Sequence, residues 1–287
     1  MKIIIAKNSG FCFGVLRAIK IALNISKKYR NVYTIGPIIH NPQVIEKLEN
    51  KGIKVIRKLP DIKSGCLIIR AHGVPKRTLN EAKRKEIKIF DATCPFVTRS
   101  KNYAVKLVKE GYRMVIIGDP EHPEIKYILS YLPKNSIVLN SPKDARKLIF
   151  SKKIGVITQT TQSPENFIKI ASGVLKYSSE IKIHSTICPD AINRQNEAVK
   201  LAGRCDVMLV LGGKNSANTK RLATISKKIQ KKTYHIEIAD EIKGSWFKNA
   251  ECVGIVSGAS TPDWIIKEVG NKIKNKKEKE EKRGQFF

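Results

Sequence analysis

One pattern recurs along the chain and constrains its fold more than any other feature: a short apolar run, then a small polar loop, then a helical pattern. Repeated strand, loop and helix segments are typical of parallel α/β architecture. The apolar runs lie at residues 3–5, 32–35, 67–69, 87–90, 114–117, 154–157, 181–183, 207–211 and 253–256. The sequence therefore predicts an α/β fold with parallel sheets.

Prolines mark the expected helix starts. Proline is favoured at the first position of a helix because its missing N–H needs no partner there. The prolines that directly follow the polar loops are Pro42, Pro75, Pro95, Pro123, Pro164, Pro189 and Pro262. We expect a helix to begin at or beside each of them.

The units group in threes, and each group is completed by a loop cysteine. Cys94 ends the first group and Cys188 ends the second, whereas the third lacks its own cysteine and receives Cys12 from the N-terminal unit. A chain of 287 residues is also longer than one hydrophobic core usually serves. We predict three similar α/β domains, at residues 13–94, 95–188 and 189–272 together with 1–12, followed by a charged tail at 273–287.

Membrane insertion and secretion are not expected. No apolar run approaches the roughly 20 residues of a membrane span. The N-terminal apolar run is too short for a signal peptide. We expect a cytoplasmic protein with no membrane partner.

The formal net charge is +30, which raises the question of nucleic-acid binding. Lysine is spread along the whole chain, however, beside much isoleucine and asparagine, as an AT-biased genome would encode. No basic stripe is interleaved with aromatic residues. We therefore expect no nucleic-acid partner and favour compositional drift, with an acidic partner as the second interpretation.

The cysteines fall into two classes by context. None forms Cys-x-x-Cys, so a zinc knuckle or a thioredoxin-type motif is unsupported. Cys66, Cys205 and Cys252 border strands without a polar loop and are interpreted as small buried hydrophobic residues. The other three occupy strand-end loops, where parallel sheets bind ligands. Three thiolates do not complete a structural zinc site, but they suit a [4Fe–4S] cluster with one open iron that acts as a Lewis acid.

Polar residues of the other loops suit an anion. His40, His72 and His122 each stand in a strand-end loop before a helix, and helix N-termini favour negative charge. Neutral donors come from Thr160, Ser216, Asn218 and Ser260. Together these side chains are more typical of a diphosphate site than of a metal site.

Glu124 is the one carboxylate in these loops that could reach a substrate. A buried phosphate nearby would raise its pKa, as a proton donor requires. A glutamate in the first turn of a helix is equally well explained by the helix dipole. The residues alone leave both interpretations open.

Eight motifs carry a resemblance that covers nearly the whole chain in order: Ser9-Gly-Phe-Cys-Phe-Gly14, Gly36-Pro-Ile-Ile-His-Asn-Pro42, Arg70-Ala-His-Gly-Val-Pro75, Asp91-Ala-Thr-Cys-Pro95, His122-Pro-Glu124, Thr158-Gln-Thr-Thr161, Lys214-Asn-Ser-Ala-Asn218 and Gly258-Ala-Ser260. With them the chain resembles the 4-hydroxy-3-methylbut-2-enyl diphosphate reductase (LytB) family. The resemblance implies three parallel α/β domains in a pseudo-threefold arrangement around a central [4Fe–4S] cluster.

The resemblance also implies residue roles. Cys12, Cys94 and Cys188 would ligate the cluster, Thr160 would lie near the substrate hydroxyl and Glu124 would donate a proton. The diphosphate would be bound by His40, His72, His122, Ser216, Asn218 and Ser260. The implied reaction removes an allylic hydroxyl with two electrons and two protons, giving isopentenyl and dimethylallyl diphosphate. Reduced ferredoxin or flavodoxin, both acidic, would supply the electrons, and a basic surface would help them dock.

The sequence departs from the family pattern in three places. Pro189-Asp190-Ala191 follow the third cysteine where the family usually has small residues in another order, Ala217 replaces a frequent serine, and Lys126-Tyr127 stand where a glycine is common. These changes concern the local backbone and substrate affinity. We do not expect them to change the reaction.

A second enzyme class stays open on the cysteines alone. Aconitase-like hydro-lyases also use three cysteines and an open iron, and they remove water without net reduction. The predicted diphosphate site argues against their carboxylate substrates, which would call for arginines. Arg70 and Arg99 are the only loop arginines expected close to the motifs. Dependence on an external reductant separates the two classes.

Overall fold

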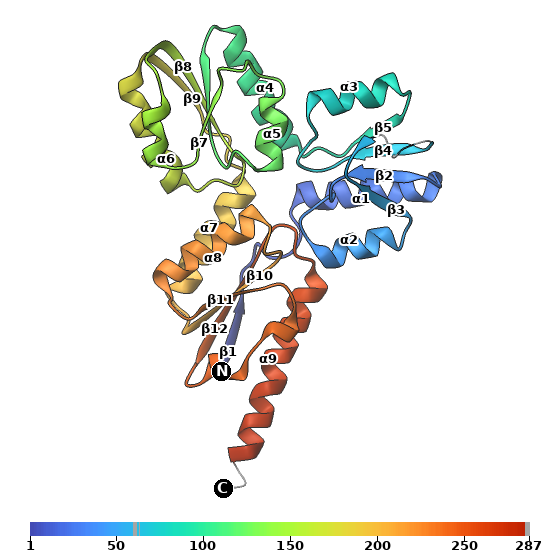
Figure 1. Cartoon of the computed structure of the whole chain (residues 1–287). Helices are drawn as coiled ribbons and strands as arrows, with labels where there is room; N and C mark the ends of the chain where they lie inside the picture. Colours follow the sequence, from blue (N-terminus) through green and yellow to red (C-terminus); the bar gives the residue numbers. More distant parts are fainter. Residues whose placement is uncertain (60–61, 63, 285–287) are drawn as a thin grey trace. The chain divides into compact units, whose positions relative to one another are not determined.

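The structure, a computed structural model, describes residues 1–59, 62 and 64–284 (Figure 1). Its strands are β1 (Lys2–Ile5), β2 (Val32–Ile35), β3 (Ile53–Ile56), β4 (Cys66–Ile69), β5 (Lys88–Asp91), β6 (Arg113–Ile117), β7 (Ile137–Leu139), β8 (Ser151–Thr158), β9 (Ser178–His184), β10 (Val207–Leu211), β11 (Thr233–Ile236) and β12 (Cys252–Ser257). Its α-helices are α1 (Phe13–Lys28), α2 (Pro42–Glu49), α3 (Lys76–Arg84), α4 (Pro95–Lys109), α5 (Pro123–Leu129), α6 (Pro164–Val174), α7 (Pro189–Ala202), α8 (Ala217–Ile229) and α9 (Asp263–Gly284). Short 3₁₀ helices lie at 142–147, 175–177, 239–241 and 244–247.

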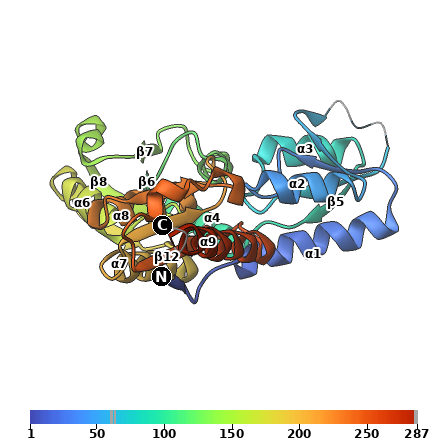
Figure 2. The same ribbon diagram turned by 90° about the horizontal axis from the view of Figure 1, so that it is seen from below.

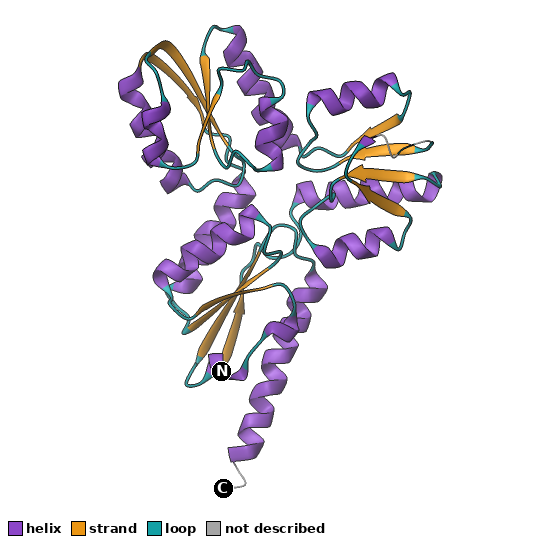
Figure 3. Ribbon diagram, viewed as in Figure 1, coloured by secondary structure: helices purple, strands orange, loops and turns teal. Residues whose placement is uncertain are grey.

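The strands form three four-stranded sheets, in the orders β3-β2-β4-β5, β7-β6-β8-β9 and β1-β12-β10-β11. Every strand pair described is parallel. The predicted parallel α/β class is therefore confirmed. Helices accompany each sheet (Figure 3), and Figure 2 shows α1 on one side of the β3-β2-β4-β5 sheet with α2 and α3 on the other.

The chain divides into two compact units. The first unit contains residues 1–12, 40–42 and 189–287 and holds the β1-β12-β10-β11 sheet. The second unit contains residues 13–39 and 43–188 and holds the other two sheets. The finer division into three domains, and their arrangement around one centre, stay predictions. Of the predicted charged tail, α9 extends to Gly284, and residues 285–287 lie outside the described part.

The three sheets share one strand order. In each, an edge strand (β5, β9 or β1) leads to a loop cysteine, and the two central strands lead to polar loops. The opposite edge strands, β3, β7 and β11, were not predicted. They are three or four residues long and are followed by none of the polar loop motifs, so the pattern that found the other strands could not find them.

The helix starts agree closely with the prolines. Helices α2, α4, α5, α6 and α7 begin at a proline. Pro75 and Pro262 directly precede α3 and α9. All strands of a parallel sheet end at the same edge, and each polar loop leads from a strand end to the start of a helix. The N-termini of these helices therefore lie at the same edge of the sheet as the polar loops.

Hydrophobic packing on both sides of the sheet is clearest in the first unit. On one side Val207, Leu209 and Leu211 of β10 share a buried cluster with Val269 of α9. On the other side Met208 of β10 packs with residues of α7. The alternation explains why β10 is apolar at every position, as strands of parallel sheets generally are. Within the described residues, no helix is both long and apolar enough to cross a membrane.

Candidate functional site

The three cysteines predicted as cluster ligands share one local geometry. Each directly precedes a helix: Cys12 precedes α1, Cys94 precedes α4 and Cys188 precedes α7. Each backbone N–H donates to a carbonyl of another strand-end loop, at 3.0 Å to Ala259, 2.9 Å to Ala71 and 2.9 Å to Thr160, respectively. A helix N-terminus stabilises a thiolate, because its N–H groups and dipole favour negative charge. The local setting of all three thiols therefore suits metal ligation.

The loop before Cys94 is fixed by its own polar groups. The Asp91 carboxylate accepts a hydrogen bond from the Thr93 N–H at 2.8 Å. The Arg17 guanidinium of α1 donates to the carbonyls of Thr93 at 3.0 Å and Asp91 at 3.3 Å. The pKa of the Cys94 thiol is raised on balance, because the effect of burial exceeds the lowering by the N–H groups of Phe96 and Val97. The sequence analysis did not identify Arg17, because this residue belongs to none of the recognised motifs.

Glu124 and Thr160 form a buried pair. Glu124 lies in the first turn of α5 and is 1% exposed. One carboxylate oxygen accepts the Thr160 N–H at 2.8 Å, and the other accepts the Thr160 hydroxyl at 2.6 Å. Burial raises the pKa of Glu124 to about 7, against the two Thr160 hydrogen bonds, which lower it. A carboxyl group with this pKa can give up a proton at neutral pH.

His122 is held in one tautomer. It caps the N-terminus of α5, where its Nδ1 accepts a hydrogen bond from the Glu124 N–H at 3.2 Å. In a neutral ring the proton then sits on Nε2, which becomes a donor. The His72 ring lies edge-on to the His122 ring, with centroids 5.5 Å apart. The second unit thus brings together His72, His122, Glu124 and Thr160.

The turn that carries His72 is packed against α5. Gly73 has φ +76°, and a Cβ there would lie 2.6 Å from the Tyr127 ring. The backbone conformation and the close approach both require glycine. Arg70 Nε donates to the Gly73 carbonyl at 3.3 Å. The departure at position 127 therefore has a structural role, because the Tyr127 ring supports the turn.

In the first unit the residues predicted to bind the diphosphate lie around the start of α8. The Ser216 hydroxyl caps this helix and accepts the Thr219 N–H at 3.3 Å. Asn218 is buried, and among the described residues neither of its amide atoms has a hydrogen-bond partner. A buried unpaired amide costs about 1–3 kcal/mol, so its presence points to a polar ligand.

His40 belongs to the first unit and meets Ser260 there. The Ser260 hydroxyl donates to the His40 carbonyl at 3.0 Å. The same carbonyl lies beside Gly213, where a Cβ would approach it to 2.6 Å. Since a hydroxyl has one proton, Ser260 must release the His40 carbonyl in order to donate to a phosphate oxygen.

Asp190, one of the residues after Cys188 that depart from the family pattern, has a structural role. The Asp190 carboxylate binds Arg194 one turn later on α7, at 2.7 Å to Nε and 3.3 Å to Nη2. Arg194 is 3% exposed and donates through Nη1 to the Ser257 carbonyl at 3.1 Å. Asp190 thus orients an arginine that holds the loop leading to Ser260. The i,i+4 spacing of the two charges could have revealed this pair in the sequence.

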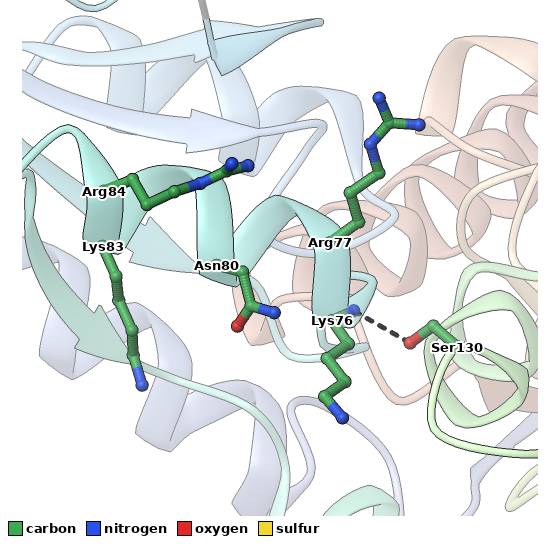
Figure 4. A pocket seen from close by; sticks show the side chains of 6 residues that line it. All are labelled: Lys76, Arg77, Asn80, Lys83, Arg84 and Ser130. Carbon is green, nitrogen blue, oxygen red and sulfur yellow. Dashed lines mark hydrogen bonds between the residues drawn. The ribbon is translucent and has the colours of Figure 1, made fainter.

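A separate basic groove runs along α3. It has a volume of about 720 Å³ and is lined by Lys76, Arg77, Asn80, Lys83, Arg84 and Ser130 (Figure 4). The Lys76 N–H donates to the Ser130 hydroxyl at 2.9 Å. Lys76, Asn80 and Lys83 point to one side of the helix in Figure 4. Four of the six lining residues are cationic and none is acidic, so the groove suits an anionic ligand or partner.

Comparison with known proteins gives one consistent result. The sequence model of the LytB protein family matches residues 3–274. The chain is 48% identical over 274 residues to the 4-hydroxy-3-methylbut-2-enyl diphosphate reductase of Syntrophotalea carbinolica, covering 95% of this chain and 98% of that protein. It is 46% identical over 273 residues to the protein of the same name from Geotalea uraniireducens, covering 95% and 97%.

Solved structures agree with the sequence comparison. A structure of (E)-4-hydroxy-3-methyl-but-2-enyl diphosphate reductase, described as the terminal enzyme of the non-mevalonate pathway, is similar with a TM-score of 0.71 and 41% identity, covering 96% of this chain and all of that one. The E-1-hydroxy-2-methyl-but-2-enyl-4-diphosphate reductase of Plasmodium falciparum is similar with a TM-score of 0.89 and 29% identity, covering 94% and 87%. The chain belongs to the LytB family.

Proposed function

We propose that this protein reduces (E)-4-hydroxy-3-methylbut-2-enyl diphosphate to isopentenyl diphosphate and dimethylallyl diphosphate, the last step of the methylerythritol phosphate pathway. Its LytB relatives carry the name of this reductase, which supports the assignment. The observation that carries the proposal is the buried hydrogen-bonded pair of Glu124 and Thr160. It supplies a proton donor of suitable pKa next to a hydroxyl that can orient it.

We propose that Cys12, Cys94 and Cys188 ligate one [4Fe–4S] cluster. Thiolates are the donors that hold such clusters, and all three cysteines stand at helix N-termini that favour the charged form. When bound, the cluster would supply electrons and an open iron as Lewis acid toward the substrate hydroxyl. The remaining steps depend on side chains of the chain itself.

In the proposed mechanism Glu124 protonates the departing hydroxyl oxygen. Thr160 donates to the carboxyl group through both its N–H and its hydroxyl, which fixes the direction in which Glu124 can deliver a proton. Loss of the C–O bond needs two electrons and leaves an allylic carbanion. Protonation at either end of that anion gives the two products.

Six side chains are assigned to the diphosphate. His122 offers its Nε2–H, and His72 lies beside it. His40, Ser216, Asn218 and Ser260 are assigned to the same group, and the unpaired amide of Asn218 supports this part of the proposal. Helix N-termini at α5 and α8 add N–H groups that favour negative charge.

We propose that reduced ferredoxin or flavodoxin delivers the electrons at the groove of α3. Both carriers are acidic, and Lys76, Arg77, Lys83 and Arg84 make the groove basic. Opposite charge on two surfaces speeds their encounter. We place the reaction in the cytoplasm, where the three thiols that are proposed as ligands would stay reduced.

The test is anaerobic reconstitution followed by iron and sulfide analysis and turnover of the hydroxylated diphosphate. Wild-type protein is compared with Cys94→Ser and with Cys66→Ser as a matched control, because Cys66 is a buried cysteine outside the proposed ligand set. We expect about four irons per chain and reductant-dependent turnover in the wild type and the control, and loss of both in Cys94→Ser. Turnover that yields a dehydrated product without reductant would instead indicate a hydro-lyase. Full iron content in Cys94→Ser would contradict the ligand assignment.

A further inference from the structure

Two cysteines outside the candidate site lie in contact. Cys205 stands just before β10 and Cys252 begins β12, and their Sγ atoms are 2.8 Å apart. Cys205 is 4% exposed, whereas Cys252 is partly exposed. In a disulfide the two sulfurs are about 2.05 Å apart, so bond formation needs a further approach of less than about 1 Å.

The backbone beneath the two thiols is held in register. The Asp206 N–H donates to the Cys252 carbonyl at 2.9 Å. The Asp206 carboxylate accepts the N–H groups of Cys252 and Glu251, each at 2.8 Å. Asp206 directly follows Cys205 and is hydrogen-bonded to both the carbonyl and the N–H of Cys252. The pairing of the sulfurs is therefore a fixed feature of the parallel pair β10 and β12.

Packing also directs the Cys205 sulfur. A Cβ at Gly254 would lie 3.2 Å from Cys205 Sγ and 2.5 Å from Met208 Sδ, so the glycine leaves room for both sulfurs. The Gln230 side-chain amide donates to the Cys205 carbonyl at 2.7 Å. Cys205 shares an apolar cluster with Met208, and Cys252 packs at the margin of that cluster. The thiol is thus enclosed on one side and faces its partner on the other.

We propose that Cys205 and Cys252 are a reversible dithiol–disulfide pair, oxidised by a small disulfide such as glutathione disulfide. The more exposed Cys252 sulfur attacks glutathione disulfide, forms a mixed disulfide and releases one glutathione. The Cys205 sulfur then attacks the Cys252 sulfur, forms the internal disulfide and releases the second glutathione. Two thiols lose two electrons and two protons, and these reduce one glutathione disulfide to two glutathione molecules.

The order of attack follows from the two environments. Burial raises the pKa of Cys205 to about 12, and so does the hydrogen bond in which its S–H donates to the Cys252 sulfur, so its thiolate is scarce at neutral pH. The thiolate is the reactive form. Cys205 therefore suits the second, intramolecular attack, where the neighbouring sulfur compensates for low thiolate content. The rate of disulfide formation should rise as the pH rises.

The link would lie away from the candidate site. Cys205 and Cys252 stand at the amino ends of β10 and β12, whereas Ser216 and Ser260 follow the carboxyl ends of the same strands. Oxidation would tie the two strands of one sheet without touching the residues assigned to the substrate. Such a cross-link restricts the unfolded chain and raises the midpoint of thermal unfolding.

The experiment uses the full-length reconstituted protein incubated with glutathione disulfide at about pH 8, near the reference pKa of a free thiol. Alkylation, digestion without reduction and mass spectrometry then locate the linked peptides. We expect one linkage, between the peptides that contain Cys205 and Cys252, with a mass loss of two hydrogen atoms that dithiothreitol reverses. The midpoint of thermal unfolding should rise on oxidation and return on reduction.

Cys66→Ser is the matched control, because it removes another buried thiol of this chain and should leave the linkage intact. Cys205→Ser and Cys252→Ser should each abolish it, and Cys205→Ser should accumulate glutathione on Cys252. Stable glutathione on Cys252 of the wild-type protein, with Cys205 still alkylatable, would overturn the proposal. So would linkages that join only other cysteines. The wild-type peptide map alone decides the question if a variant fails to fold.

Discussion

Thr160 directs both of its hydrogen-bond donors at Glu124: its N–H reaches one carboxylate oxygen at 2.8 Å and its hydroxyl reaches the other at 2.6 Å. The carboxyl group is 1% exposed and has little other solvation, so burial and these two bonds control its proton.

Glu124→Gln should lower kcat by about 10²–10⁴-fold, because a glutamine cannot supply the proton that the leaving oxygen requires. The amide retains an acceptor for the Thr160 N–H, and the fold should persist. Steady-state turnover of the reconstituted enzyme, with the thermal unfolding midpoint beside it, measures both effects. Glu121→Gln is the control, since Glu121 lies nearby and its side chain is 81% exposed. Equal turnover in the two variants would exclude Glu124 as the donor.

The pH dependence follows from the raised pKa of Glu124. In the free enzyme the carboxyl group keeps its proton up to about pH 7, so kcat/KM should fall as the pH rises through 7. Stability has the same sign: the contribution of the protonated group is complete below 4.5, its ordinary pKa, and is lost as the pH rises through 7. Glu124→Gln should flatten the stability profile between these values. A wild-type kcat/KM profile that is level across neutral pH would contradict this role.

Thr160→Val should move the alkaline fall of kcat/KM to higher pH. The valine removes the hydroxyl that donates to Glu124, and this hydrogen bond lowers the pKa of the carboxyl group. Thr160→Ser keeps a hydroxyl and should restore the wild-type position of the fall. A merely structural role would lower activity at every pH without moving the profile.

Asn218→Leu should weaken substrate binding while leaving the protein at least as stable. Replacing a buried amide that has no partner by an apolar group of similar volume removes a cost of about 1–3 kcal/mol from the folded state. We expect a higher KM with an unchanged or higher free energy of unfolding in urea. Ser226→Ala is the matched control, since the Ser226 hydroxyl, two turns along α8, is also buried and has no partner among the described residues. The control should leave KM unchanged.

Charge reversal in the groove of α3 should impair electron delivery by a carrier protein but not delivery by a small chemical reductant. Lys83→Glu with Arg84→Glu should raise the KM for ferredoxin or flavodoxin, and this KM should depend less on ionic strength than in the wild type. Turnover with dithionite, a small reductant that needs no docking surface, should stay the same. Lys227→Glu with Lys228→Glu, two exposed changes on α8, is the control for net charge. Equal effects of both reversals on the carrier would remove the groove as its docking surface.

The strands that lead to loops with candidate functional residues were predicted better from the sequence than the strands that only complete the edges of the sheets. Strands β2, β4, β6, β8, β10 and β12 each end in a motif-bearing loop, and their apolar runs were recognisable. The edge strands β3, β7 and β11 were missed because none of the polar loop motifs follows them, even though β7 (Ile137–Leu139) is apolar throughout. Position in a sheet depends on long-range pairing, which local composition does not record.

The candidate site shows the same division. Glu124 and Thr160 could be named from their loops, but their contact spans 36 residues of sequence and depends on where β8 ends beside α5. Arg17 was missed because its partners are backbone carbonyls, which carry no sequence signal. Cys205 and Cys252 were interpreted as separate buried residues, and only the pairing of β10 with β12 brings their sulfurs together.

The pairing of β1 with β12 sets an order on biosynthesis. Strand β1 can pair with its neighbour, Cys252 to Ser257, only after synthesis has passed β12, and the Cys12 N–H can reach the Ala259 carbonyl later still. Until then the N-terminal segment has no place in its sheet, because domains normally fold as their residues emerge. We therefore expect a cofactor that uses Cys12 to be loaded only after the chain has been synthesised beyond Ala259.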